Sequence, residues 1–192
     1  MSVSILGGAA KGMILAAPDP KSARPTSALL KRKFFDSHQS MEGQNFYDIC
    51  AGSGSIGFEA LSRGASKVCF VEAAAGSFKV LKKNLELIRE KASLSGRVEL
   101  VKSDCVKWLK GFDEPGENIF YFDPPYENVA LYRSFLETFM EVSKERSVIC
   151  SKFIMEFCRQ KTAPEAEVQS WFGKPDKFYR QGTSFLYIYD FS

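Results

Sequence analysis

Residues 46–57, Phe-Tyr-Asp-Ile-Cys-Ala-Gly-Ser-Gly-Ser-Ile-Gly, decide the fold that this chain is expected to adopt. Residues 46–50 are apolar enough for a buried strand, and the glycines that follow have the spacing Gly-x-Gly-x-x-Gly. Residues 56–63 then predict a helix that ends at Gly64. Glycines permit a tight turn and allow a ligand to approach the backbone closely. The stretch predicts a strand, a ligand-binding turn and a helix, although the same pattern also suits a plain connecting turn.

The rest of the chain continues this alternation of strands and helices. Further strands are predicted at 68–72, 98–102, 119–122 and 153–157, and helices at 77–91, 105–109 and 131–144. Residues 168–172 and 184–189 are expected to form a closing antiparallel pair. Strands that alternate with helices imply a parallel sheet covered on both faces. We therefore predict an α/β protein with a mostly parallel, seven-stranded, Rossmann-like sheet that ends in an antiparallel strand.

Each of the first four predicted strands carries an acid at or near its carboxyl end: Asp48, Glu72, Asp104 and Asp123. Ligands of such sheets bind beyond the carboxyl ends of the strands. Glu72 lies 20 residues after Gly52, where a carboxylate can accept hydrogen bonds from ribose hydroxyls, as it does for dinucleotides. Asp104 could accept from the amine of an adenine ring or could instead cap the helix that follows it. The acids predict a nucleoside-containing cofactor beside the glycine turn.

The segment Asp123-Pro124-Pro125-Tyr126 predicts methylation of an exocyclic amine. Two prolines after a strand-ending acid hold the backbone extended and remove two amide donors. The Asp123 carboxylate and the Pro124 carbonyl could then hold the two protons of an amine, while Tyr126 stacks on a base. Such an amine is a poor nucleophile because its lone pair is delocalised into the ring. The alternative interpretation is a strand that ends in a proline turn with a packed tyrosine.

The composition is that of a soluble globular protein. The chain has 192 residues, of which 45% are hydrophobic and 26% are charged, and no apolar run approaches the roughly 20 residues that span a bilayer. The N-terminus lacks the features of a secretory signal, so we expect a cytoplasmic protein. Five cysteines without a Cys-x-x-Cys pair, and a single histidine, predict reduced thiols and no metal site.

The N-terminal region carries a local excess of positive charge. Residues 21–33 contain five basic residues and no acid, a pattern that could meet phosphates or be a solvated helix face. Residues 27–37 have apolar residues at helical spacing, so we expect an amphipathic helix with its basic residues outward. The proline-rich residues 18–25 are expected to separate a short N-terminal arm from the main domain. We predict one domain, residues 1–192, with a substrate-binding extension at 1–40 and a catalytic core at 41–192.

In the order and spacing of its motifs, the chain resembles the RsmD-like family, bacterial enzymes that methylate the exocyclic amine (N2) of a guanine in 16S ribosomal RNA. The shared motifs are Ile5-Leu6-Gly7-Gly8, Lys11-Gly12, Arg24-Pro25-Thr26, residues 48–57 and 59–65, Phe70-Val71-Glu72, Asn84-Leu85, residues 123–126 and Glu156. The resemblance implies a class I fold dependent on S-adenosylmethionine. It also implies that ribosomal RNA or the small ribosomal subunit is the partner, and we expect a monomer.

The motifs, the charge pattern and the resemblance together give the candidate site residues. The cofactor S-adenosylmethionine is expected at Asp48, Ala51, Gly52, Ser53, Gly54, Glu72, Asp104 and Cys105. The guanine is expected at Asp123, Pro124 and Tyr126, and RNA at Arg24, Thr26, Lys31, Arg32 and Lys33. The chain departs from the family pattern at Arg32, where an acid is usual, at Leu29, where an arginine is usual, and at residues 73–75, which are all alanine.

Two other functions remain open at this point. A DNA adenine or cytosine amine methyltransferase could use the same Asp-Pro-Pro-Tyr segment, but such enzymes usually carry an extra target-recognition region of many tens of residues. A dinucleotide-binding oxidoreductase or a non-catalytic binding module could use the same glycine turn. Hydride transfer would need an acid or base near the nicotinamide, and the single histidine, His38, is poorly placed for that role.

Overall fold

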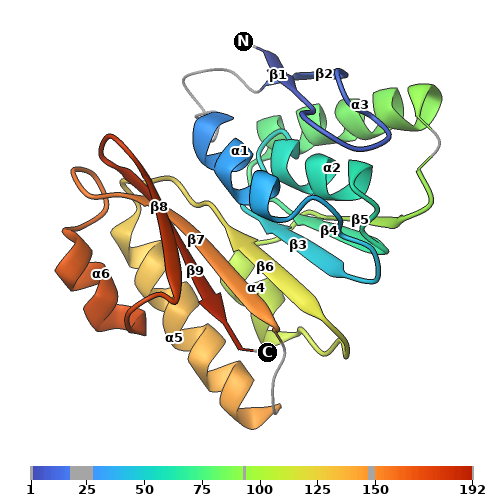
Figure 1. Cartoon of the computed structure of the whole chain (residues 1–192). Helices are drawn as coiled ribbons and strands as arrows, with labels where there is room; N and C mark the ends of the chain where they lie inside the picture. Colours follow the sequence, from blue (N-terminus) through green and yellow to red (C-terminus); the bar gives the residue numbers. More distant parts are fainter. Residues whose placement is uncertain (1, 18–27, 93, 147–149, 192) are drawn as a thin grey trace.

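A seven-stranded sheet forms the centre of the molecule in the computed structural model, which describes residues 2–17, 28–92, 94–146 and 150–191 (Figure 1). The strand order is β5-β4-β3-β6-β7-β9-β8, in which β9 runs antiparallel to both of its neighbours. The strands are β3 (Asn45–Ile49), β4 (Lys67–Val71), β5 (Arg97–Val101), β6 (Asn118–Phe122), β7 (Lys152–Cys158), β8 (Lys177–Gln181) and β9 (Ser184–Asp190). The predicted mostly parallel sheet with an antiparallel closing strand is confirmed.

Helices cover both faces of this sheet, three on each side (Figure 1). One face carries α1 (Ala28–Ser37), α2 (Ser55–Ser62) and α3 (Ala75–Lys91), and the other carries α4 (Cys105–Lys110), α5 (Val129–Glu145) and α6 (Glu165–Phe172). The central strand β6 supplies both cores because successive side chains of a strand point to opposite faces. Ile119 and Tyr121 pack under α1–α3, whereas Phe120 and Phe122 pack under α4–α6.

The structure corrects one predicted strand, because residues 168–172 form the end of helix α6. Val168 is buried, and Trp171 and Phe172 are partly buried against the same core, which is the i, i+3, i+4 spacing of a helix. The outermost strand is instead β8, whose side chains are mostly exposed. No local pattern predicts β8, because a polar edge strand lacks the alternation of apolar and polar residues that marks a half-buried strand.

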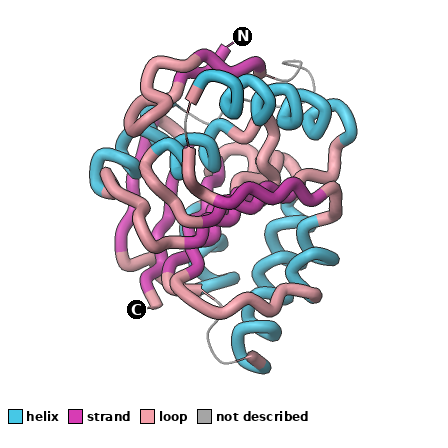
Figure 2. Tube along the Cα trace, turned by 90° about the vertical axis from the view of Figure 1, so that its right-hand side faces the viewer, coloured by secondary structure: helices cyan, strands magenta, loops and turns pink. Residues whose placement is uncertain are grey.

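The N-terminal residues form a small hairpin, β1 (Ser2–Ser4) with β2 (Ile14–Ala16), that is tied to the main domain. Figure 2 shows this hairpin beside α3. The Asn84 side chain of α3 accepts from the Ala16 amide and donates to the Ala16 carbonyl, each at 2.9 Å. The same Asn84 amide group donates to the Ser53 carbonyl in the glycine turn, also at 2.9 Å. One side chain therefore joins the hairpin to the turn.

Glu59 of α2 is a second anchor for the N-terminal residues. Its carboxylate is fully buried and accepts from the backbone amides of Leu6 and Gly7 at 2.7 and 2.8 Å. Arg63 and Lys31 form ion pairs with the same carboxylate at 2.9 and 3.1 Å. A buried carboxylate is tolerable only with such partners. The shared Ile-Leu-Gly-Gly motif therefore contacts a specific acceptor in the core.

Candidate active site

Asp48 lies beneath the glycine turn and connects β3 to α2. Its carboxylate accepts from the Gly57 amide at 2.8 Å, and the side chain is almost completely buried. Burial, opposed by the Gly57 hydrogen bond and reinforced by the nearby carboxylates of Asp123 and Glu72, raises the pKa of Asp48 to about 8. Asp48 supports the start of the helix from below, so its predicted contact with the cofactor stays a prediction.

The three glycines of the turn have different surroundings. A Cβ at Gly52 would meet nothing within 4 Å, and Gly52 has a positive φ of 58°. A Cβ at Gly54 would lie 2.4 Å from a methyl group of Leu81, and one at Gly57 would lie 2.4 Å from the ring of Phe70. Gly54 therefore lets the turn lie close to α3, and Gly57 lets α2 lie close to β4. The first faces open space, where a ligand can reach the backbone.

Glu72, at the end of β4, holds the outer edge of this turn. One carboxylate oxygen accepts from the Gly52 amide at 2.8 Å and the other from the Ala74 amide at 2.7 Å. The residue is 8% exposed, and each oxygen of a carboxylate can accept a second hydrogen bond. Glu72 therefore keeps the capacity to accept from two hydroxyls of a ribose placed over Gly52. This donor and acceptor set fits the expected nucleoside.

Asp104 and Cys105 form the next part of the same edge, at the start of α4. Asp104 is exposed, and its Oδ1 accepts from the Lys107 amide at 2.9 Å, which makes it the helix cap. This capping role does not use the Oδ2 atom, so the predicted contact with adenine stays a prediction. Cys105 is buried, with its Sγ 4.0 Å from the Sγ of Cys50. The hydrogen bond between the two sulfur atoms, together with burial, raises the pKa of the Cys50 thiol well above its usual value.

The Asp-Pro-Pro-Tyr segment follows β6 directly and lies beside the glycine turn. The Asp123 amide donates to the carbonyl of Ile49, the last residue of β3, at 3.2 Å. Asp123 is half-buried, Pro124 is buried and Tyr126 is half-buried. The Pro124 carbonyl accepts from the Tyr132 hydroxyl at 3.4 Å. The structure thus brings the predicted base-binding residues next to the predicted cofactor-binding turn.

Glu156 belongs to the shared motifs without a predicted role, and the structure connects it to this segment. Glu156 is fully buried in β7 and accepts from the hydroxyl of Tyr126 and, at 3.3 Å, from that of Tyr121. Its backbone carbonyl accepts from the Tyr132 hydroxyl at 2.8 Å. An acid within the otherwise apolar strand 153–157 was the available signal, because acids are almost never fully buried without partners.

The basic residues predicted to contact RNA do not share one surface. Lys31 is only 1% exposed, and it donates to the Ser55 carbonyl at 2.8 Å in addition to its ion pair with Glu59. The expectation that Lys31 points outward is wrong because Lys31 lies on the apolar side of α1, three and four residues before Phe34 and Phe35. A partner that needs an accessible cation cannot use it.

The remaining predicted RNA-contacting residues have different outcomes. Arg32 is exposed, as expected for an outward basic residue. Lys33 is half-buried, and its ammonium group donates to the Arg180 carbonyl of β8 at 2.9 Å. Arg24 and Thr26 lie outside the described residues. The RNA-binding role of Arg24, Thr26, Arg32 and Lys33 stays a prediction.

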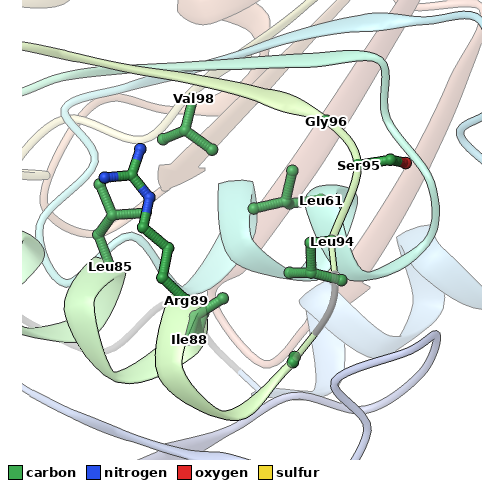
Figure 3. Close-up of a pocket in the computed structure, with 9 residues that line it drawn as sticks. Leu61, Leu85, Ile88, Arg89, Leu94, Ser95, Gly96 and Val98 are labelled. Atoms are coloured by element: carbon green, nitrogen blue, oxygen red, sulfur yellow. The ribbon is translucent and has the colours of Figure 1, made fainter.

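A pocket of about 480 Å³ lies away from all of these residues (Figure 3). It is formed by α2, the end of α3 and the residues that lead into β5, so it opens at the amino ends of the strands. Most of its lining residues are apolar, and the Arg89 and Ser95 side chains add polar groups. The lining residues are Leu61, Leu85, Ile88, Arg89, Ala92, Leu94, Ser95, Gly96 and Val98. None of the predicted site residues lines this pocket.

Comparison with known proteins gives both a fold and a family. The solved structure of yhhF from Escherichia coli has a TM-score of 0.72 and 23% identity, covering 99% of this chain and 98% of that one. An RNA methyltransferase from Salinibacter ruber, solved in complex with S-adenosyl-L-homocysteine, has a TM-score of 0.59 and 14% identity, covering 87% and 93%. These likenesses confirm the predicted class I methyltransferase fold.

A sequence relative carries a functional name. The Haemophilus influenzae protein named Ribosomal RNA small subunit methyltransferase D is 34% identical over 130 residues, which cover 65% of this chain and 64% of that protein. The match therefore spans less than two thirds of the relative's length. The model of the family described as "Conserved hypothetical protein 95" matches residues 3–188, nearly the whole chain. The chain belongs to this family, which is the RsmD family that its motifs resemble.

Proposed function

We propose that this protein transfers a methyl group from S-adenosylmethionine to the exocyclic amine of a guanine in 16S ribosomal RNA. The observation that carries the proposal is the position of Asp123-Pro124-Pro125-Tyr126, which follows β6 and is hydrogen-bonded to the end of β3, where the glycine turn begins. The name of the Haemophilus influenzae relative supports the choice of small-subunit ribosomal RNA.

The cofactor part of the proposal rests on the chemistry of the turn. S-adenosylmethionine supplies the methyl group on a positively charged sulfur when it is bound. Gly52 leaves open space over the backbone, and Glu72 retains acceptor capacity for ribose hydroxyls. The Asp104 Oδ2 atom, which does not cap the helix, would accept a hydrogen bond from the adenine amine, with Cys105 and Ala51 as neighbours. The complex of the Salinibacter ruber methyltransferase with S-adenosyl-L-homocysteine supports the same cofactor class.

The target amine needs orientation more than it needs a strong base. The Asp123 carboxylate would accept a hydrogen bond from one N–H of the amine and the Pro124 carbonyl from the other, which favours a pyramidal nitrogen with an available lone pair. The Pro124 carbonyl has a second lone pair besides the one that faces Tyr132. Tyr126 would stack on the guanine, and stacking of this kind contributes about 1–3 kcal/mol per base. The nitrogen proton becomes acidic only after methylation, so Asp123 can accept it late.

Residues of the N-terminal region would hold the RNA backbone. Arg32 is the described residue that fits this role best, and Arg24, Thr26 and Lys33 are proposed to act with it. Lys31 is excluded by its burial. A compact chain suits a substrate whose own folded shape supplies much of the specificity. Such a substrate would place the protein in the cytoplasm, with the ribosome.

Labelled methyl transfer to three substrates tests the proposal: small ribosomal subunits purified from cells that lack this protein, naked 16S RNA, and double-stranded DNA. We expect label in RNA, and nucleoside analysis should identify it as N2-methylguanosine. Label in DNA alone would contradict the proposed substrate. A preference for NAD over S-adenosylmethionine in calorimetry would contradict the proposed cofactor and favour the oxidoreductase alternative.

A further inference from the structure

Glu156 is a buried carboxylate with tyrosine hydroxyls as partners. It is 0% exposed, and its two carboxylate oxygens accept from different rings, one from Tyr126 and the other from Tyr121 at 3.3 Å. Burial of an acid is costly unless hydrogen bonds replace the lost water. A strand position between Met155 and Phe157 would be more stable with an apolar residue, so the acid at this position needs another explanation.

The partners of Glu156 connect the rigid core to the base-binding segment. The Tyr121 ring packs in the core with Phe34 and Phe46, at centroid distances of 5.9 and 6.3 Å. Tyr121 is therefore held by packing, and its hydroxyl gives Glu156 a fixed point. On the other side, Tyr126 belongs to the segment that we propose to hold the guanine.

Tyr132 adds a second connection between the same two places. Its hydroxyl lies 2.8 Å from the Glu156 carbonyl and 3.4 Å from the Pro124 carbonyl. Two of the groups proposed to meet the base, the Tyr126 ring and the Pro124 carbonyl, are thus linked to residue 156 by tyrosine hydroxyls. Networks of this kind hold side chains in one arrangement when every member has a partner.

We propose that Glu156 is a positioning residue that fixes Tyr126 in the orientation required to stack on the target guanine. This inference rests on the proposed function. Glu156 accepts a hydrogen bond from the Tyr126 hydroxyl and is expected to have no contact with the reacting amine. Burial, followed by the charges of Glu156 and Asp123, raises the pKa of Tyr126 far above its usual range, so the hydroxyl remains a donor at all working pH values.

A double-mutant cycle between the two residues tests the proposal. Glu156→Gln removes the charge and one acceptor, and Tyr126→Phe keeps the ring but removes the hydroxyl. Each should lower kcat by about 10-fold, because misplaced reacting groups lose the advantage of orientation. The affinity for S-adenosylmethionine should stay within about twofold. The double variant should be no slower than the slower single variant, because both changes remove the same interaction.

Tyr47→Phe is the matched control. The Tyr47 hydroxyl also donates to a glutamate, Glu114, at 3.1 Å, but neither residue belongs to the proposed site. Its kcat should equal that of the wild-type protein. Thermal unfolding of every variant checks that the comparison is made between folded proteins. If Glu156→Gln does not fold, Tyr126→Phe alone still tests the contact.

Two results would overturn the positioning role. One is a wild-type kcat for Tyr126→Phe, because the hydroxyl would then be unnecessary. The other is a double variant whose loss equals the product of the two single losses, because Glu156 would then act independently of Tyr126. Failure of the wild-type protein to methylate any of the RNA substrates would instead contradict the proposed function itself, so the two failures can be told apart.

Discussion

A buried carboxylate holds the proposed binding residues at the carboxyl ends of β3–β5, and another does so at those of β6–β7. The two carboxylates have different kinds of partner. Glu72 accepts from the backbone amides of Gly52 and Ala74, whereas Glu156 accepts from the hydroxyls of Tyr126 and Tyr121. A surface made of backbone atoms changes little when neighbouring side chains are substituted. A surface made of side chains can be altered by single substitutions that each remove one hydroxyl group. We therefore expect variants to separate cofactor binding from base positioning.

The largest effect is expected from Asp123→Ala. The carboxylate is assigned to the target amine, so methyl transfer should fall by about 10²–10³-fold, as it does when one preorganised group at a reacting centre is removed. The affinity for S-adenosylmethionine should be nearly unchanged. Single-turnover transfer and calorimetry would measure the two quantities. A strong loss of cofactor affinity would remove the proposed separation between the two regions.

Glu72→Ala should have the opposite pattern. It removes the acceptor of two backbone amides and should weaken cofactor binding by about 2 kcal/mol, or roughly 30-fold in Kd. The rate at saturating cofactor should fall much less. Glu86→Ala, an exposed acid on α3, is the control and should leave the Kd unchanged. Equal Kd values for Glu72→Ala and wild type would show that the edge of the turn is not the ribose site.

A smaller effect is expected from reversal of charge at Arg32, an exposed residue of α1. Arg32→Glu should weaken binding to naked 16S RNA and reduce the salt dependence of the affinity by about one unit of slope, the value for one phosphate contact. Lys91→Glu, at the far end of α3, makes the same charge change at the amino ends of the strands and should have no effect on the slope. Equal salt slopes for Arg32→Glu and wild type would leave Arg32 as a solvated residue.

The smallest effect concerns Asp48, which lies between the two regions and responds to both. Its pKa is raised to about 8 by burial and by the charges of Asp123 and Glu72, against the opposing effect of the Gly57 hydrogen bond. Carboxyl-carbon magnetic resonance should find a titration near pH 8 that moves lower in Asp123→Asn. A titration that is the same in both proteins would mean that Asp48 does not sense the base-binding region.

The same shift predicts how stability varies with pH. The folded-state pKa of Asp48 is higher than the value of about 3.9 for an unfolded chain, so folding favours the protonated acid. The contribution of Asp48 to the free energy of unfolding is therefore fully present below about pH 4 and is lost as the pH rises to about 8. Asp48→Asn should flatten this dependence in denaturant unfolding. An unchanged slope between pH 5 and pH 8 would contradict it.

Much of this molecule follows from local patterns in the chain. The strands β3, β4, β6 and β7 are largely apolar runs, and the glycine spacing needs only neighbouring residues to be recognised. Residues 168–172 were read as a strand because a short apolar run suits either structure when its length alone is considered. The helix became evident only from the burial of Val168 and its neighbours on one side. Local pattern was least informative where the elements were short or polar.

The sequence by itself determined the doubly covered sheet, the glycine turn, the acids at the strand ends and the Asp-Pro-Pro-Tyr segment, because each is encoded by residues close together in the chain. Only the tertiary structure decided which partners the Lys31 and Glu156 side chains have. Their partners, Glu59 and Tyr126, are about 30 residues away along the chain, and Lys31, Glu59 and Glu156 are buried. Whether a charged residue faces water or an opposite charge depends on which distant segment packs against it, and no local pattern contains that information.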